Sequence, residues 1–241
     1  MESLRDTFDS HEGRLVAKID HFFDVYETYF SSFSRFRDTP VRILEIGIAR
    51  GGSLELWRRY FGTSAAIHGV DVSAEAVACA PPDTTAHLGS QADVDFLATL
   101  ARQHGPFDLI IDDASHFPEH QIASFKVLYP TMSSDGIYVC EDVFTSYWKE
   151  YGGEMGSPDT MIEYVKRLID DLHGFWASDA SVKPSDFTRT TKGIHIHSGT
   201  VVFERGISEE PEYVLRHGTD LTAISVAKLK SAAGRQNSPP T

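Results

Sequence analysis

The stretch LIIDDASHFPEHQ contains two adjacent carboxylates, Asp112 and Asp113, and a histidine, His116, follows three positions after the second. An apolar run leads directly into the two acids, and such a run is typical of a buried strand. A second apolar stretch, GIYVCEDV, runs into Glu141 and Asp142. Unpaired carboxylates near a core repel one another and raise one another's pKa values. This concentration of acids therefore predicts either basic partners or a bound cation.

Basic partners are scarce near these acids in the sequence, where the nearest lysines are Lys126 and Lys149. Carboxylate oxygens in this number suit a hard divalent cation such as Mg²⁺ or Mn²⁺, which keeps open positions for water or substrate. Zinc is disfavoured because no Cys/His ligand spacing occurs in the chain. The acids favour Mg²⁺ or Mn²⁺, and pairing with Lys or Arg is the alternative.

A bound dication would give His116 a chemical role. An alcohol holds its proton about as tightly as bulk water, with a pKa near ~15.7, and coordination to a metal lowers that value by many units. A neutral imidazole can then accept the proton. The alternative for His116 is a helix-capping or surface histidine, but its place beside Asp113 favours a general base.

Strands and helices alternate from Val41 onward, which predicts a doubly wound, mostly parallel α/β sheet. The last two strands are joined by a short turn at Ser198-Gly199, which predicts an antiparallel terminal hairpin. The expected strands span residues 41–47, 65–72, 84–90, 107–113, 136–143, 193–198 and 200–206. The expected helices lie at 54–61, from 74 onward, and at 92–103, 118–129 and 159–173.

The stretch LEIGIARGGS joins the first strand to the following helix through a turn rich in glycine: Gly47, Gly51 and Gly52, with Ser53 as the helix cap. Glycines allow the backbone to approach a ligand, and the helix N-terminus favours a negative group. The spacing E-x-G-x-x-x-G-G fits neither the dinucleotide fingerprint nor the P-loop. Asp71 closes the second strand, where an acid receives ribose hydroxyls in such sheets. Together these features predict a cofactor site.

The stretches EIGIARGGS, GVDV and LGSQADVDFL resemble the motifs of class I S-adenosylmethionine (SAM) dependent methyltransferases. The resemblance covers about residues 41–205 and implies a Rossmann-like, seven-stranded sheet that binds SAM. It implies that Glu45, Gly47 and Gly51 line the methionine part of the cofactor. Asp71 would hold the ribose, and the loop after the third strand would contact adenine. The implied cofactor site comprises Glu45, Gly47, Gly51, Ser53, Asp71, Ser90, Gln91, Asp93 and Asp112.

The D-D-A-S-H and E-D motifs resemble those of the metal-dependent sugar O-methyltransferases of antibiotic biosynthesis, of the mycinamicin and tylosin type. HFFDVYETYFSSF and GIHIHSGTVVFERG resemble the same group. The resemblance implies that Asp113, Glu141 and Asp142 bind Mg²⁺ (or Mn²⁺) and that His116 is the general base. We therefore expect methyl transfer from SAM to a hydroxyl of a sugar or polyhydroxylated small molecule in natural-product biosynthesis.

Three other functions are compatible with parts of this pattern. A catechol or phenol O-methyltransferase uses similar metal chemistry, but a phenol, with a pKa near ~10, needs less activation. A non-catalytic SAM-binding protein would have no use for the intact metal-plus-base constellation. A hydroxylase from a related cephalosporin-modifying family would usually need a two-histidine, one-carboxylate iron site, which the sequence does not supply.

The chain of 241 residues carries 22 basic and 35 acidic side chains, a net charge of −13. This charge repels phosphate backbones and anionic membrane surfaces, so neither nucleic acid nor membrane is an expected partner. The two cysteines, Cys79 and Cys140, are expected to be reduced thiols. With no apolar N-terminal core and no apolar run near ~18 residues, we expect a soluble, cytoplasmic protein.

The expected domain organisation has three parts. Residues 1–37 form an N-terminal helical segment, since aromatic and aliphatic side chains recur at helical spacing over 14–37. This segment is expected to pack on the domain, with a role as a lid or a subunit interface in a homo-oligomer as the alternative. Residues 38–226 form the methyltransferase domain, and 227–241 form a flexible tail rich in Ser and Pro at its end.

Overall fold

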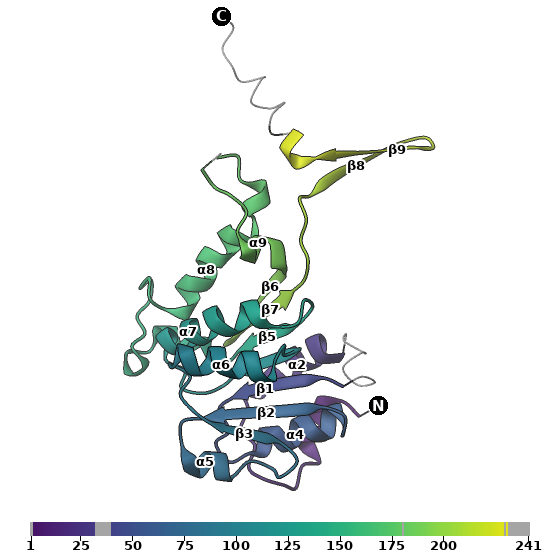
Figure 1. Cartoon of the computed structure of the whole chain (residues 1–241). Coiled ribbons are helices and arrows are strands. Elements are labelled where there is room, and N and C mark those ends of the chain that lie inside the picture. The colour runs from purple at the N-terminus through teal and green to yellow at the C-terminus, as the bar shows by residue number, and fades with distance from the viewer. Residues whose placement is uncertain (1, 32–39, 180, 229, 231–241) are drawn as a thin grey trace, which may run out of the picture.

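The computed structural model describes residues 2–31, 40–179, 181–228 and 230, and its centre is a seven-stranded sheet (Figure 1). The strands are β1 (Arg42–Ile46), β2 (Ala66–Asp71), β3 (Thr85–Leu88), β4 (Leu109–Asp112), β5 (Ile137–Cys140), β6 (Thr191–His197) and β7 (Thr200–Arg205). Their order is β3-β2-β1-β4-β5-β7-β6, and β7 runs antiparallel to the other six strands. The expected doubly wound sheet with an antiparallel terminal hairpin is confirmed.

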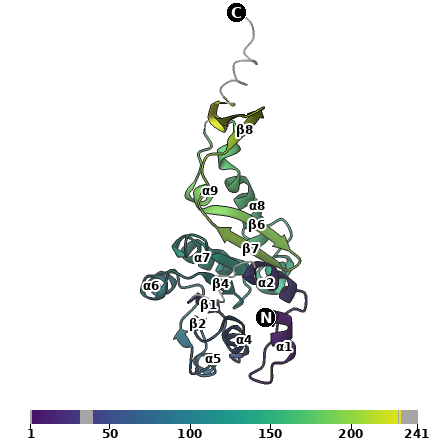
Figure 2. The same cartoon turned by 90° about the vertical axis from the view of Figure 1, so that its right-hand side faces the viewer.

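Helices cover both faces of this sheet (Figure 2). The α-helices are α1 (Leu4–Asp9), α2 (Phe22–Ser31), α4 (Gly52–Phe61), α5 (Ala74–Ala78), α6 (Val94–His104), α7 (Pro118–Leu128), α8 (Met161–Leu172) and α9 (Asp186–Thr190). The core on one face is built from the sheet with α1, α2 and α4, and the core on the other face with α6, α7 and α8. No helix in the described parts of the chain is long and apolar enough to cross a membrane.

The central strands form where the sequence is continuously apolar. All four residues of β4 and all four of β5 are buried, as is usual for parallel strands that are covered on both faces. The helices begin at recognisable caps. The side chain of Asp93 accepts a hydrogen bond from the amide of Phe96 at the start of α6, and Pro118 occupies the first turn of α7. These elements lie close to the predicted bounds.

The N-terminal segment differs from the prediction. The expected helix over 14–37 is wrong in its first part, because residues 11–20 are irregular and α2 begins at Phe22; residues 32–37 lie outside the described part of the chain. The irregular segment runs over the glycine turn. A Cβ on Gly52 would lie 2.2 Å from the carbonyl oxygen of Leu15, so the absence of a side chain permits this close packing. A continuous helix would have lost that contact.

The aromatic face of α2 packs in the core, as the first of the two interpretations expected. Phe22, Phe23, Tyr26 and Phe30 are at most 1% exposed. Tyr26 and Phe30 both make edge-on contacts with the ring of Trp57 on α4. The helix is therefore fixed against the sheet by its aromatic side chains.

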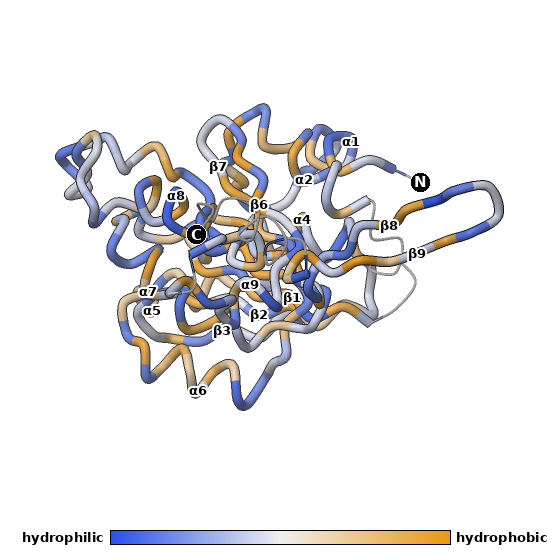
Figure 3. The backbone as a smooth tube through the Cα atoms, turned by 90° about the horizontal axis from the view of Figure 1, so that it is seen from above, coloured by the Kyte–Doolittle hydropathy of each residue, from blue (hydrophilic) through white to orange (hydrophobic). Residues whose placement is uncertain are grey.

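A second antiparallel pair was not expected from the sequence. Strands β8 (Glu212–His217) and β9 (Asp220–Ser225) form a separate two-stranded sheet. This hairpin projects away from the rest of the molecule (Figures 1 and 3). Of the expected flexible tail, most residues lie outside the described part of the chain.

A buried histidine on β2 makes stability depend on pH. Burial, together with His87 and His104, lowers the pKa of His68 to about 4, and the rings of His68 and His87 are stacked. The folded-state pKa is thus below the unfolded value of 6.5. The stabilisation that this shift implies is present above pH ~6.5 and is lost as pH falls toward 4.

Replacing His68 with leucine is therefore expected to reduce the acid-induced loss of stability, by up to about 3 kcal/mol. The measurement is urea unfolding of wild type and variant at several pH values between 7 and 4. The exposed His21→Leu serves as the control and should follow the wild-type curve. Parallel curves for His68→Leu and wild type would contradict the role of His68.

Candidate active site

Acidic side chains meet at the carboxyl ends of the central strands. β4 and β5 are neighbouring parallel strands, with Asp112 opposite Cys140. Asp113 follows directly after β4, and Glu141 and Asp142 follow directly after β5. The structure thus places the two acidic motifs side by side at the sheet edge where ligands bind in such folds.

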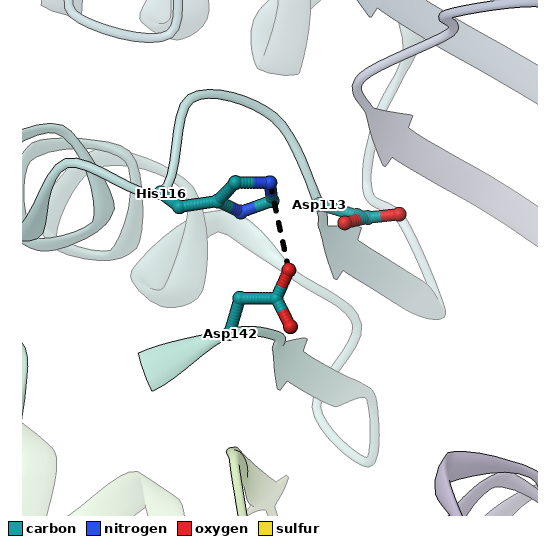
Figure 4. Close-up of side chains that lie close together, drawn as sticks. All are labelled: Asp113, His116 and Asp142. Atoms are coloured by element: carbon teal, nitrogen blue, oxygen red, sulfur yellow. Dashed lines mark ion pairs between the residues drawn. The ribbon is translucent and has the colours of Figure 1, made fainter. Parts of the chain in front are cut away.

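Two of these acids and a histidine are arranged so that they could hold a metal ion. Asp113, His116 and Asp142 each offer a ligand atom, and these atoms all lie within 4.8 Å of one another (Figure 4). His116 Nε2 lies 3.5 Å from Asp142 Oδ2. Two buried atoms of the group, His116 Nδ1 and Asp142 Oδ1, have no hydrogen-bond partner among the described residues. Because buried polar atoms are nearly always paired, these two atoms indicate a missing ligand.

Backbone strain is concentrated at the same place. Among the described residues, three that are not glycine have a positive φ angle: Ala49 at 48°, His116 at 56° and Asp142 at 53°. Each such residue costs of order ~1–3 kcal/mol and persists only where the surrounding structure enforces it. Ala49 lies in the glycine turn, and the other two lie in the acidic group. The strain therefore supports a functional role for both predicted sites.

The acids have a basic partner that the sequence did not reveal. Lys18, on the irregular N-terminal segment, has a side chain that is 1% exposed and places its Nζ 2.6 Å from Asp113 Oδ2 and 2.8 Å from Glu141 Oε1. A third carboxylate oxygen, from Glu45, lies 3.4 Å from the same nitrogen. Although burial opposes the charge on Lys18, Asp113 and Glu141 raise its pKa well above 10.5. Basic residues are scarce near the acids in the sequence, as expected. The alternative to a metal, pairing with a basic side chain, is nevertheless met in part by Lys18, which is distant in the sequence.

One lysine does not neutralise the group. Burial and the nearby Asp113 raise the pKa of Glu141 to about 8, and burial raises the pKa of Asp142. Tyr26 also donates a hydrogen bond to Glu141 from its buried hydroxyl. Three carboxylates therefore share the single ammonium group of Lys18, Asp142 adds a fourth acid beside His116, and the surplus negative charge favours a bound cation.

The structure provides room for that cation. A cavity of about 370 Å³ borders the acids and is lined by Ala17, Lys18, Ile19, Asp113, Glu141 and Asp142. Oxygen ligands, an open cavity and unpaired buried polar atoms together fit Mg²⁺ or Mn²⁺. Asp113 and Asp142 are the acids that could hold the ion, and His116 offers a third ligand atom. Glu141 borders the same cavity and is engaged by Lys18.

The predicted cofactor residues converge in part on a second cavity. This cavity, of about 360 Å³, is lined by Gly47, Asp71, Ser90 and Gln91 and also reaches Asp113. It lies beside the carboxyl ends of β1 and β2, as expected for a SAM site. The cavity thus brings the glycine turn, the acid of β2 and the loop after β3 together.

Asp71 also shapes the glycine turn. Its Oδ2 accepts hydrogen bonds from the amides of Ile48 and Ala49, at 2.9 and 3.2 Å, and its Oδ1 accepts one from Ser73. Gly47 has a φ angle of 107°, and a Cβ there would lie 2.1 Å from the carbonyl oxygen of Asp113. Glycine is therefore required at position 47 by both conformation and space.

Three predicted cofactor residues lie at the glycine turn but outside the 360 Å³ cavity. Glu45 is fully buried and accepts hydrogen bonds from Ser53 Oγ and Trp57 Nε1. Ser53 borders a smaller cavity of about 100 Å³, shared with Lys18 and Gly47. Gly51 precedes α4 in the left-handed conformation, and a Cβ there would meet the carbonyl oxygen of Cys79 at 2.3 Å. Their contact with the cofactor stays a prediction.

Asp93 and Asp112 also lie outside the 360 Å³ cavity. Asp93 caps α6, as described above. Asp112 is 1% exposed and accepts hydrogen bonds from Ser124 and Tyr138, and burial raises its pKa to about 7. It also accepts a hydrogen bond from Gln91. Asp112 is therefore placed to orient Gln91, which lines the cavity.

Sequence reasoning missed Lys18 as a site residue, and it did not foresee the hydrogen bond from Tyr26 to Glu141. Lys18 is 95 residues from Asp113 and 123 from Glu141, so no local spacing connects them. Tyr26 belongs to the aromatic face of α2, but nothing in that pattern distinguishes a core tyrosine from one whose hydroxyl reaches Glu141.

Replacing Lys18 with methionine is expected to lower the free energy of unfolding by about 3–5 kcal/mol without metal, because the buried acids lose their partner. Mg²⁺ should restore part of the loss, since an ion that binds only the folded state stabilises it. The measurement is urea unfolding with and without Mg²⁺. The exposed Lys149→Met is the matched control. An unchanged midpoint for Lys18→Met would contradict the buried ion-pair interpretation.

Comparisons with known proteins agree with this geometry. No protein-family model matches the chain. A curated tetracenomycin-C rhamnosyl 3'-O-methyltransferase of Streptomyces olivaceus is 36% identical over 219 residues, which cover 82% of this chain and 54% of that protein. Demethylmacrocin O-methyltransferase of Streptomyces fradiae is 36% identical over 211 residues, covering 82% and 53%. Mycinamicin VI 2''-O-methyltransferase of Micromonospora griseorubida is 33% identical, covering 82% and 52%.

A solved structure is similar over nearly the whole chain. The MycE methyltransferase of the mycinamycin pathway, in complex with Mg, SAH and mycinamycin VI, superimposes with a TM-score of 0.76 at 28% identity. The alignment covers 90% of this chain and 57% of MycE. The chain spans about half the length of the curated relatives that it matches. Over 82% of its length the chain is thus similar to the curated sugar O-methyltransferases of macrolide and tetracenomycin biosynthesis, and its fold is similar to that of MycE.

Proposed function

We propose that this protein is a Mg²⁺-dependent O-methyltransferase that moves a methyl group from SAM to a sugar hydroxyl of a glycosylated small molecule. The observation that carries the proposal is the position of Asp113. This residue lines both the 360 Å³ cavity, with Gly47 and Asp71, and the 370 Å³ cavity, with Glu141 and Asp142. A methyl donor in the first cavity and a hydroxyl in the second would therefore be neighbours.

The residues of the site divide the chemistry between them. Mg²⁺ held by Asp113 and Asp142, with Glu141, would lower the pKa of a hydroxyl beside it. His116 accepts the proton of that hydroxyl, and a proton on its Nε2 would lie near Asp142 Oδ2, 3.5 Å away. The hydroxyl oxygen forms a bond to the methyl carbon as the bond from carbon to the SAM sulfur breaks. Asp71 and the glycine turn hold SAM during this step.

We further propose that residues 1–37 act as a lid over the site. Support comes from the position of this segment beside two cavities. Residues Leu15 to Lys18 border the 100 Å³ cavity at the glycine turn. Ala17, Lys18 and Ile19 border the 370 Å³ cavity beside the acids. The methyltransferase domain would span 38–226, and residues 227–241 would form a flexible tail.

We also propose that the protein works in the cytoplasm as a homo-oligomer with neither nucleic acid nor membrane as a partner. Cys79 and Cys140 are both free thiols, which suits a reducing compartment. The net charge of −13 disfavours binding to polyanions.

The experiment is methyl transfer from labelled SAM to a panel of deoxysugar glycosides, followed by mass spectrometry of the product. EDTA should abolish turnover, and added Mg²⁺ or Mn²⁺ should restore it. Calorimetry in parallel should show that the chelated protein still binds SAM. Full turnover after exhaustive chelation would reject the metal-dependent mechanism. Transfer to a catechol but to none of the glycosides would reject the sugar as acceptor.

A further inference from the structure

The β8–β9 hairpin, residues 212–225, is here called the arm. It pairs with no strand of the central sheet and stands clear of the helices (Figures 1 and 2). Its base is fixed, because the amide of Val226 donates to the carbonyl of Pro211 and Val226 itself is 4% exposed. The arm is therefore an ordered projection with a fixed base.

Each face of the arm carries exposed apolar side chains among its charged and polar ones. Tyr213 and Leu215 lie on one face, 51% and 50% exposed, and Val214 and Leu221 lie on the other, 64% and 62% exposed. A strand pair that is apolar on both faces is typical of a buried sheet. A two-stranded hairpin alone is at best marginally stable in water. Independent stability requires three or more strands with a hydrophobic face, or packing against a helix. The arm therefore lacks a partner that adds strands to it.

The sequence of β8 is complementary to itself. In a hairpin closed by two residues, the pair next to the turn is hydrogen-bonded and such pairs alternate along the ladder. Since His217 pairs with Asp220, the amides of residues 212, 214 and 216 point outward from the pair. Two copies of β8 can therefore pair antiparallel, with Val214 opposite Val214 of the second copy.

This register brings complementary side chains together. Glu212 lies opposite Arg216 of the second copy, twice by symmetry, and Tyr213 lies opposite Leu215. Opposite charges and aromatic–aliphatic pairs both stabilise directly opposed positions on a sheet. The outer edge of β9 offers no such match, because the same construction places Leu221 opposite Ser225.

We propose that the arm is a dimerisation element, in which the β8 strands of two copies of this chain pair about a two-fold axis to form a four-stranded sheet. The contact is isologous, so it closes at two copies. It also removes the exposed edge of β8, which would otherwise be a site of uncontrolled strand pairing.

A charge-swap cycle tests this register. Glu212→Arg places Arg opposite Arg216, and Arg216→Glu places Glu opposite Glu212. Each single variant should weaken the dimer about ten- to thirtyfold by sedimentation equilibrium, because two pairs change per dimer. The double variant E212R/R216E should restore wild-type association. Glu209→Arg, the same charge change at the base of the arm, is the matched control and should leave association unchanged.

The charge-swap variants test association and the methylation assay tests turnover, so the two proposals can fail independently. A dimer that is lost in both single variants and restored in the double variant supports the proposal. A monomeric wild type at tens of micromolar overturns it, as does a dimer that tolerates both single variants or one that the double variant fails to restore. Circular dichroism on each variant confirms that the central domain remains folded.

Discussion

Replacing His116 with alanine is expected to lower kcat by about 10²–10⁴-fold, the usual cost of losing a general base. The loop between β4 and α7 places His116 beside Asp142 and holds it at a positive φ angle. The carbonyl oxygen of His116 accepts a hydrogen bond of 2.6 Å from Thr145, which fixes the loop against the chain after β5. The imidazole is thus held beside Asp142, where the proposed mechanism requires a proton acceptor.

The affinities of His116→Ala for SAM and Mg²⁺ distinguish a general base from a structural histidine. SAM and Mg²⁺ should still bind to His116→Ala, because the proposed ligands of both remain, so the loss should fall on kcat. The wild-type rate should decrease toward acid pH, since only a neutral imidazole accepts a proton, and the residual rate of the variant should lack this limb. His173→Ala, which changes a histidine outside both cavities, is the control. Near-normal kcat, or an acid limb retained in the variant, would assign the base to another group.

The central strands and the acids that follow them could be predicted because both depend on local sequence. Parallel strands buried on both faces must be continuously apolar, so LIID and IYVC can be recognised as strands from their sequence. Once these strands are neighbours, Asp113 and Asp142 have to meet at their carboxyl ends. The glycine turn is equally local, since Gly47 is required by its own φ angle.

Lys18 could not be predicted, because its role depends on tertiary contacts. The aromatic spacing over 14–37 favours a helix, yet contacts with Asp113 and Glu141 accompany an irregular segment before Phe22. The packing of α2 against the core and the buried ion pairs of Lys18 both stabilise this arrangement. Neither can be inferred from the spacing of the apolar residues. Tertiary packing here overrides local helix propensity.

The arm was missed for a different reason. Its strands carry apolar residues on both faces together with charged residues, and a short run of this type is ambiguous between strand and helix. Gly218, with a φ angle of 60°, marks the turn, but a lone glycine is a weak indication. Asp93 has a local role that the sequence pattern did not indicate, since its side chain caps α6; its contact with adenine stays a prediction.

Replacing Asp71 with alanine is expected to raise the Kd for SAM by about 10²–10⁴-fold. A carboxylate that accepts two ribose hydroxyl hydrogen bonds contributes about 1.5–3 kcal/mol through each, because the acceptor is charged. Asp71 Oδ2 also accepts hydrogen bonds from the amides of Ile48 and Ala49. The variant should therefore also loosen the glycine turn. Calorimetric titration with SAM is the measurement.

Asp93→Ala is the matched control for this prediction, because both residues are acids that the sequence assigned to the cofactor. The structure places Asp93 as the cap of α6, outside the cavity that Asp71 lines. Its loss should lower the free energy of unfolding by about 1 kcal/mol and leave SAM affinity unchanged. Asp71→Asn retains an acceptor but not the charge, and it should fall between alanine and wild type. Equal SAM affinity in Asp71→Ala and wild type would remove Asp71 from the cofactor site.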